Sequence, residues 1–190
     1  MRKLILQMQV SVDGFVADTD GDTGWLVSNW DQPLKDYVLA LTAPVDLILI
    51  GRKLAHEFIP AWSARASDPD IADVYTHRMN DLDKMVFSRT QTEHGWKNTV
   101  LVNEDLTEEV ARLKKSPGGD IITYGGSSFA ASLIQAHLID EFHLFVNPVA
   151  IGKGQSIFHL LDQHLPVKLV SATSFLCGIV VLFYQPQYRR

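Results

Sequence analysis

The chain has 190 residues, of which 46% are hydrophobic, so it can bury one sizeable core, and no repeat, low-complexity tract or linker divides it; we expect one domain over residues 1–190. A net charge of −5 argues against nonspecific nucleic-acid binding, and a single cysteine excludes an internal disulfide framework. Because no apolar run is long enough to span a bilayer and no secretory signal opens the chain, we expect a cytoplasmic protein with neither a membrane nor a nucleic-acid partner.

The first half of the chain alternates predicted strands and helices. Its predicted strands, rich in branched apolar residues, are residues 3–10, 45–51, 84–88 and 98–102. Between the first two, Leu34, Val38 and Leu41 share one helical face, with Asp31 as the predicted N-cap. Residues 52–58 predict a short helix directly after a buried strand.

The second half continues the alternation and closes with a hairpin. The clearest helix starts after Asp105, which is its predicted N-cap, with Glu108 at the capping-box position. A further helix is predicted over 128–138. The predicted strands of this half are residues 120–124, 141–151, 167–175 and 179–185, the last two joined near Gly178.

Strands that alternate with helices predict a mostly parallel sheet covered by helices on both faces, an α/β fold of three layers. The closing hairpin predicts antiparallel strands at one edge of that sheet. In such sheets ligands bind beyond the carboxyl ends of the parallel strands. Three sequence segments occupy these ends: 51–53, 88–90 and 125–128.

Two adjacent glycines end the strand at 120–124. Gly125 and Gly126 lead into a helix that starts at Ser127 or just after it, and the free amides of a helix start suit a phosphate group. A tight turn with Ser127 as an ordinary N-cap is the alternative. The residues alone leave both open, since neither the dinucleotide fingerprint nor the P-loop spacing is present.

Basic residues follow the other two strands. Arg52, Lys53 and Arg89 stand directly after apolar strands in an acidic protein, where a parallel sheet would bring them to one edge. A guanidinium binds phosphate oxygens with two hydrogen bonds, so the three residues could hold an anionic ligand. Each by itself could equally be a solvated surface residue.

We expect no metal site. The loop 18–22 spaces its aspartates as an EF-hand does, but Thr23 occupies the required glycine position and Asn29 the twelfth. His56 begins a helical zinc pattern whose partner position holds Pro60.

The chain resembles the dihydrofolate-reductase-like family, and in particular the C-terminal reductase domain of riboflavin biosynthesis. The resemblance spans nearly the whole chain and rests on five segments in the family's order: "SVDGFVA", "LILIGRK", "KMVFSRT", "ITYGGSSF" and "DEFHLFVNPVAIGKGQSIF". It implies a single α/β domain, NADPH lying across the strand ends, and a homodimer formed through the antiparallel edge.

The resemblance also implies which residues bind NADPH. Gly51, Arg52 and Lys53 are implied at its phosphates. Ser88 and Arg89 are implied at the adenosine end, where an arginine can neutralise the 2′-phosphate. The segment under the pyrophosphate and nicotinamide comprises Gly125, Gly126, Ser127, Ser128 and Phe129, and the family's Gly-Gly peptide is cis. Leu54 stands where relatives commonly have threonine, so a hydroxyl contact is lost there, although a backbone amide could still serve.

The substrate side is less determined by the sequence. By resemblance, the turn at Asp13 and Gly14 borders the substrate pocket, and Trp25 closes over it from the polar loop. A purely structural Asp-Gly turn is the alternative. Asp36, on the first helix, is the candidate for a pterin-binding carboxylate, against the alternative of an exposed helix acid. Asp13 and Asp36 are the two candidate catalytic residues.

Three functions follow from the resemblance. The first is an NADPH-dependent reductase of 5-amino-6-(5-phosphoribosylamino)uracil or a related small heterocycle. The second is a dihydrofolate reductase, which requires a buried carboxylate at or near Asp36. The third is a protein that binds NADPH without catalysis. No deaminase signature accompanies the reductase-like segments.

Overall fold

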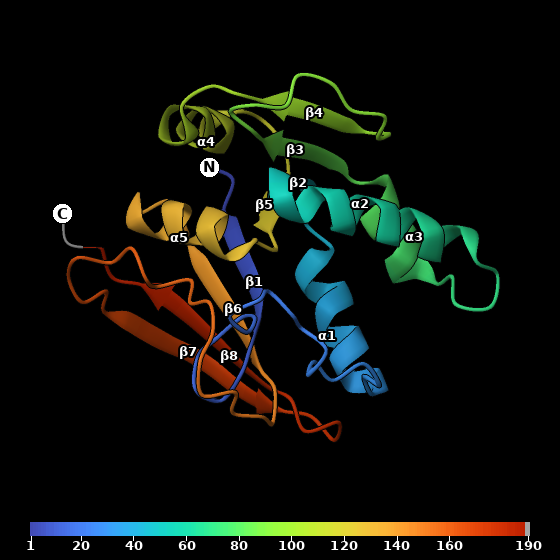
Figure 1. Ribbon diagram of the computed structural model, residues 1–190, viewed down its shortest axis with the longest axis vertical. Coiled ribbons are helices and arrows are strands. Elements are labelled where there is room, and N and C mark those ends of the chain that lie inside the picture. Colours follow the sequence, from blue (N-terminus) through green and yellow to red (C-terminus); the bar gives the residue numbers. More distant parts are fainter. Residues whose placement is uncertain (189–190) are drawn as a thin grey trace.

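The central layer of the protein is one twisted sheet (Figure 1). The structure is a computed structural model and describes residues 1–188. Its strands are β1 (Leu4–Val10), β2 (Val45–Gly51), β3 (Asp83–Phe87), β4 (Thr99–Val102), β5 (Asp120–Thr123), β6 (Glu141–Val146), β7 (Val167–Ser174) and β8 (Val180–Pro186). Their order across the sheet is β4-β3-β2-β5-β1-β6-β8-β7. The first six in this order pair in parallel, and β8 pairs antiparallel with both β6 and β7. The predicted parallel sheet with a closing antiparallel hairpin is therefore confirmed.

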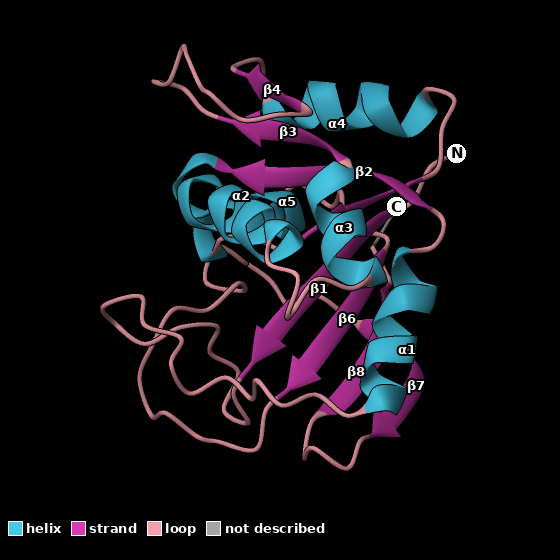
Figure 2. Ribbon diagram, turned by 90° about the vertical axis from the view of Figure 1, so that its right-hand side faces the viewer, coloured by secondary structure: helices cyan, strands magenta, loops and turns pink. Residues whose placement is uncertain are grey.

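Helices cover both faces of this sheet (Figure 2). They are α1 (Gln32–Thr42), α2 (Arg52–Ser67), α3 (Val74–Asp81), α4 (Leu106–Lys115) and α5 (Ser127–Gln135). On one face, buried residues of α4 and α5 such as Val110 and Leu133 pack against the even-numbered side chains of β1. On the other face, α2 and α3 pack through Ile59 and Met79, and α1 packs through Leu34. The central strands are thus buried on both faces, which explains the long apolar run of β2.

The helical region after β2 is longer than the sequence predicts. Instead of a short helix over 52–58, α2 continues through Pro60 to Ser67, and α3 follows as a helix that the sequence analysis did not predict. Trp62 packs against Phe58 and against Tyr75 of α3, so tertiary contacts support the helix beyond the proline. The capping box of α3 uses a threonine at its third position, and its helix has few apolar residues, so its local signal is weak.

The ends of other helices and strands are set by hydrogen bonds of nearby residues. The Asp31 carboxylate accepts the Leu34 amide at the start of α1, and Asp105 caps α4, as predicted. Strand β6 stops at Val146 rather than at residue 151. The Asn147 amide still donates to the Val10 carbonyl of β1, but Pro148 has no amide hydrogen and the Val149 amide turns back to the Asn147 carbonyl.

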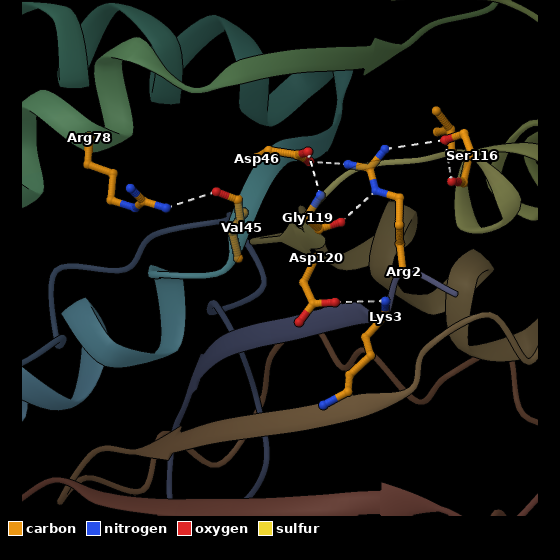
Figure 3. A network of polar contacts seen from close by, with 9 residues as sticks. Arg2, Lys3, Val45, Asp46, Arg78, Ser116, Gly119 and Asp120 are labelled. Carbon is orange, nitrogen blue, oxygen red and sulfur yellow. Dashed lines mark hydrogen bonds and ion pairs between the residues drawn. The ribbon is translucent and has the colours of Figure 1, made fainter.

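A polar network closes the amino ends of the strands (Figure 3). The Arg2 guanidinium pairs with the Asp46 carboxylate and donates to the Gly119 carbonyl at 2.6 Å and to Ser116 Oγ at 3.5 Å. A Cβ on Gly119 would lie 2.2 Å from the Pro44 carbonyl oxygen, so this turn requires glycine. A hollow of about 300 Å³ lies beside the network, but the Arg2 guanidinium that lines it is paired with Asp46, and it is at the opposite edge from the predicted ligand loops.

Strand register brings those three loops together. Gly51 pairs with Phe87, and Leu49 pairs with Thr123, so segments 51–53, 88–90 and 125–128 leave the sheet at one edge. The expectation that the parallel sheet gathers them is confirmed. Within residues 1–188, no helix is both long enough and apolar enough to cross a membrane.

Candidate functional site

The glycines at the strand ends contact one another. The Gly51 amide donates to the Gly125 carbonyl at 3.3 Å. A Cβ on Gly51 would lie 2.8 Å from Cβ of Phe129, and a Cβ on Gly125 would lie 2.9 Å from Met8 Cε. Gly125 also has a φ of +102°, which L side chains rarely adopt. The protein's own packing therefore explains why neither Gly51 nor Gly125 carries a side chain, without any ligand.

Gly126 is different, because the space around it is open. A Cβ there would meet only Leu54 Cβ, at 3.9 Å. Gly126 is the N-cap of α5 and makes no side-chain capping bond, so the alternative of Ser127 as an ordinary N-cap is wrong. The peptide between Gly125 and Gly126 is cis, as the resemblance implies. Backbone can thus be approached closely at Gly126, at the positive end of a helix.

The first turn of α5 holds the two serines of the predicted segment. Ser127 Oγ donates to Gln155 Oε1 at 2.6 Å, and the Ser128 side chain is exposed. The first amides of a helix have no partner within it, so those of Ser127 to Phe129 face the sheet edge. The Phe129 ring packs on Phe87 at 5.3 Å between centroids and fixes the helix against β3.

The basic residues lie at this same edge. Arg52 is half-buried at the first position of α2, whereas Lys53 and Arg89 are exposed. Within residues 1–188, no carboxylate lies at ion-pair distance from any of the three. Three positive charges without internal counterions make this edge electropositive, although the chain as a whole is acidic.

Ser88 has a structural part in this edge. Its buried hydroxyl oxygen accepts the amides of Thr90 at 3.3 Å and Gln91 at 2.9 Å, which shapes the turn that presents Arg89. Of the two residues predicted at the adenosine end, Arg89 is therefore the one with a free side chain.

Side chains that no sequence pattern indicates hold the next loop, residues 88–98, in place. His56 Nε2 lies 3.0 Å from Gln91 Oε1, and the His56 ring meets the Trp96 ring edge to face, 5.0 Å between centroids. These contacts attach loop 88–98 to α2. They join residues 35 or more positions apart, so no local pattern could have indicated them.

The Asp13 carboxylate is bonded to the protein. It accepts the Ser11 hydroxyl at 2.6 Å and the amides of Gly152 and Ile151 at 2.7 and 3.2 Å. The Ser11 hydroxyl, followed by the Gly152 amide, lowers the pKa of Asp13 below its ordinary value of 3.8. Gly14, with a φ of +85°, completes the turn. This arrangement supports the structural alternative for Asp13 and Gly14.

Asp36 does not reach the interior. Its side chain is exposed on α1 and accepts a hydrogen bond from Gln32 Nε2 at 2.7 Å. The alternative of an exposed helix acid is therefore confirmed for Asp36, and a buried, pterin-facing carboxylate there is wrong, because the inward face of the helix carries Leu34 and Val38. Trp25 is half-buried, and its indole N–H has no hydrogen-bond partner within residues 1–188.

The acidic loop is held mainly by its own bonds. Asp18 Oδ1 accepts the amides of Asp20 and Asp22, each at 2.8 Å. Its amino end is joined to Gln155 by the Ala17–Gln155 bridge, and beyond its other end Val27 donates to the Asn147 side chain. No group of three or more histidine, cysteine or acidic residues within residues 1–188 could hold a metal ion.

A group of aromatic residues lies beneath the glycine pair. Tyr124, directly before Gly125, stacks on Phe58 at 5.3 Å, and its hydroxyl donates to Met79 Sδ at 3.3 Å. Burial raises the pKa of Tyr124 well above its usual value and that of the neighbouring Tyr75 to about 12. Both phenols therefore stay protonated at neutral pH and can donate hydrogen bonds.

The chain is similar in sequence to proteins of Bacillus subtilis and Corynebacterium ammoniagenes. The chain is 34% identical over 186 residues to Uncharacterized protein YyaP of Bacillus subtilis (strain 168), covering 96% of this chain and 94% of that protein. It is 25% identical over 177 residues to riboflavin biosynthesis protein RibD of Corynebacterium ammoniagenes, covering 90% of this chain but 49% of the relative. The chain thus spans about half the length of that RibD protein.

Solved structures share the fold. A protein from Shewanella sp. PV-4 ascribed to riboflavin biosynthesis has a TM-score of 0.74 at 22% identity, covering 98% of this chain and 99% of that one. A Thermotoga maritima deaminase and 5-amino-6-(5-phosphoribosylamino)uracil reductase has a TM-score of 0.69 at 18% identity, covering 98% and 57%. Dihydrofolate reductase from Enterococcus faecalis, complexed with NADP(H), has a TM-score of 0.60 at 13% identity, covering 98% and 97%.

These likenesses establish a dihydrofolate-reductase-like α/β fold. The model of one family, described as the RibD C-terminal domain, matches residues 2–181, nearly the whole chain. The chain belongs to the RibD C-terminal domain family.

Proposed function

We propose that this protein is an NADPH-dependent oxidoreductase that transfers hydride to a small heterocycle, resembling 5-amino-6-(5-phosphoribosylamino)uracil reductase. One observation carries the proposal: Arg52, Lys53 and Arg89, which pair with no carboxylate of residues 1–188, meet the amino end of α5 at a single edge of the sheet. An anion-binding edge of this kind in a fold shared with nucleotide-dependent reductases supports a phosphorylated dinucleotide as its ligand.

The residues present fit such a cofactor. The open backbone at Gly126 and the first amides of α5 would bind the pyrophosphate, with Arg52 and Lys53 adding charge. Arg89 would bind the 2′-phosphate, which distinguishes NADPH from NADH. Leu54, 3.9 Å from the Cβ position at Gly126, would give an apolar contact where relatives commonly have threonine.

When bound, the cofactor supplies the hydride. The residues of this chain would orient it and exclude water at the strand ends. Tyr124, whose hydroxyl donates to Met79 Sδ and whose ring stacks on Phe58, would support the strand end beneath the glycine pair by packing. Asp13 contributes by holding the turn at 11–15, since its oxygens are engaged by the protein.

Calorimetric titration with NADPH and NADH, at low and moderate salt, tests the proposal. We expect NADPH to bind more tightly than NADH, and Arg89→Ala to weaken NADPH binding by about 1.5–3 kcal/mol while leaving NADH binding nearly unchanged, because one charge-assisted contact is lost. Arg112→Ala is the control, since Arg112 lies on α4 and pairs with Glu109. Absence of binding by either nucleotide would refute the cofactor assignment.

The two other functions predict different results. A folate reductase would need a buried carboxylate near the substrate, and the exposed Asp36 does not provide one. A protein that binds NADPH without catalysis would show the calorimetric binding but would not oxidise NADPH with 5-amino-6-(5-phosphoribosylamino)uracil or related heterocycles. We further propose that the protein acts in the cytoplasm, as a homodimer.

A further inference from the structure

Gln155 lies at the amino end of α5, outside every segment that the sequence analysis assigned to the site. Its Oε1 accepts the Ser127 hydroxyl at 2.6 Å. Its backbone pairs with the segment before the acidic loop, because the Gln155 amide donates to Ala17 and the Val16 amide donates to Gln155, at 2.8 and 2.9 Å. One residue therefore joins the proposed phosphate-binding helix to the start of the acidic loop.

The side chain of Gln155 also lies against the acidic loop itself. A Cβ on Gly21 would be 3.6 Å from Gln155 Nε2, which places the amide next to the loop backbone. The hydrogen bonds within 18–26 are local, such as those of Asp18 to Asp20 and Asp22. Gln155, through its side chain and the Ala17–Gln155 bridge, thus borders the loop at one end, and the Val27 to Asn147 bond borders it at the other.

The Ser127 hydroxyl has only one proton to donate. In this structure it donates that proton to Gln155, so a phosphate oxygen at the start of α5 would have to take it from Gln155. A phosphate oxygen that accepts the Ser127 proton therefore excludes the Ser127–Gln155 bond. Release of Gln155 would in turn free the side chain that lies against the acidic loop.

We propose that the Gln155 side chain is a built-in competitor for the cofactor phosphate at Ser127, and that its displacement couples cofactor binding to the acidic loop 18–26. This inference rests on the proposed function, because it requires a dinucleotide phosphate at the amino end of α5. It assigns Gln155 a positioning role: it acts through Ser127 and does not contact the reacting atoms.

Substitutions at Gln155 have opposite predicted effects on NADPH affinity. Gln155→Leu removes the competing acceptor, so the dissociation constant should fall about 2- to 10-fold, the worth of one neutral hydrogen bond. Gln155→Glu should raise it by about 10-fold or more, because a carboxylate holds the Ser127 proton more strongly and repels phosphate. Calorimetry on the full chain with NADPH as the probe measures both.

A double substitution separates this mechanism from a general change at the site. A Ser127→Ala variant has no hydroxyl for Gln155 and a phosphate to compete for. Adding Gln155→Leu to this variant should therefore leave the NADPH dissociation constant unchanged. Gln32→Leu is a matched control, since that glutamine is exposed on α1 and bonds only to Asp36 among the side chains of residues 1–188.

Hydrogen exchange provides a readout that does not depend on activity. In the unmodified protein, NADPH should speed amide exchange across 18–26, whereas in Gln155→Leu exchange should already be fast and should not respond to NADPH. Equal or weaker NADPH binding by folded Gln155→Leu, or the same exchange response as the unmodified protein, would overturn this inference and leave the proposed function standing. Failure of the unmodified protein to bind NADPH would overturn it together with the proposed function.

Discussion

At the scale of single residues, the glycines of the two strand ends are required for different reasons. Gly51 leaves room for Phe129, and Gly125 leaves room for Met8 and takes a positive φ. Gly126 faces open space, so no packing contact requires a glycine there. A ligand at the amino end of α5 is the remaining reason for it. The sequence presents all three simply as glycines, and the contacts that distinguish them come from other elements.

We expect Gly51→Ala to destabilise the fold by about 1–3 kcal/mol, because its Cβ would lie 2.8 Å from Cβ of Phe129 and the helix must shift. Urea denaturation followed by circular dichroism measures the loss. Gly95→Ala is the matched control, since a Cβ there meets nothing within 4 Å. Equal stability of the two variants would show that Phe129 does not press on Gly51.

At the scale of elements, the turn at 11–15 is attached to the segment after β6 by one carboxylate. The Asp13 carboxylate accepts the backbone amides of Ile151 and Gly152, which lie 138 and 139 positions further along the chain. The same two segments meet again at the Ala17–Gln155 bridge. The strand-end loops on this side therefore form one connected layer, to which the acidic loop is attached.

This attachment predicts a pH dependence. Because folding lowers the pKa of Asp13, its carboxylate stabilises the fold above its ordinary pKa of 3.8, and this contribution is lost as the pH falls through the lower folded value. Asp13→Asn should therefore unfold at lower urea concentration than the unmodified protein at pH 7, and the difference should shrink below pH 3.8. Asp20→Asn, on the exposed acidic loop, serves as the control. A difference that stays constant with pH would argue against the carboxylate.

At the scale of the whole molecule, the sheet has two unlike edges. β4 ends one side, and the outer strand β7 ends the other, where Val167, Leu169 and Val170 are 41–51% exposed. An exposed apolar edge strand is a site for pairing with another chain. This observation agrees with the homodimer that we propose.

Light scattering after size-exclusion chromatography should give about twice the chain mass of 21.3 kDa. Leu169→Lys should shift the protein toward the single-chain mass, because it places a charge on the proposed interface. Val100→Lys, on the opposite edge strand β4, should leave the mass unchanged. A single-chain mass for the unmodified protein would refute the dimer.

The sequence by itself determined the alternation of strands and helices, the caps at Asp31 and Asp105 and the closing hairpin, because periodicity and capping act over a few neighbouring residues. It also placed the basic residues and the glycine pair at strand ends, which a parallel sheet gathers at one edge. Only the tertiary structure decided that Asp36 points to solvent, that α2 continues past Pro60, and that Ser127 bonds to Gln155. Such features depend on contacts between residues far apart in the chain, whose energies no local pattern records.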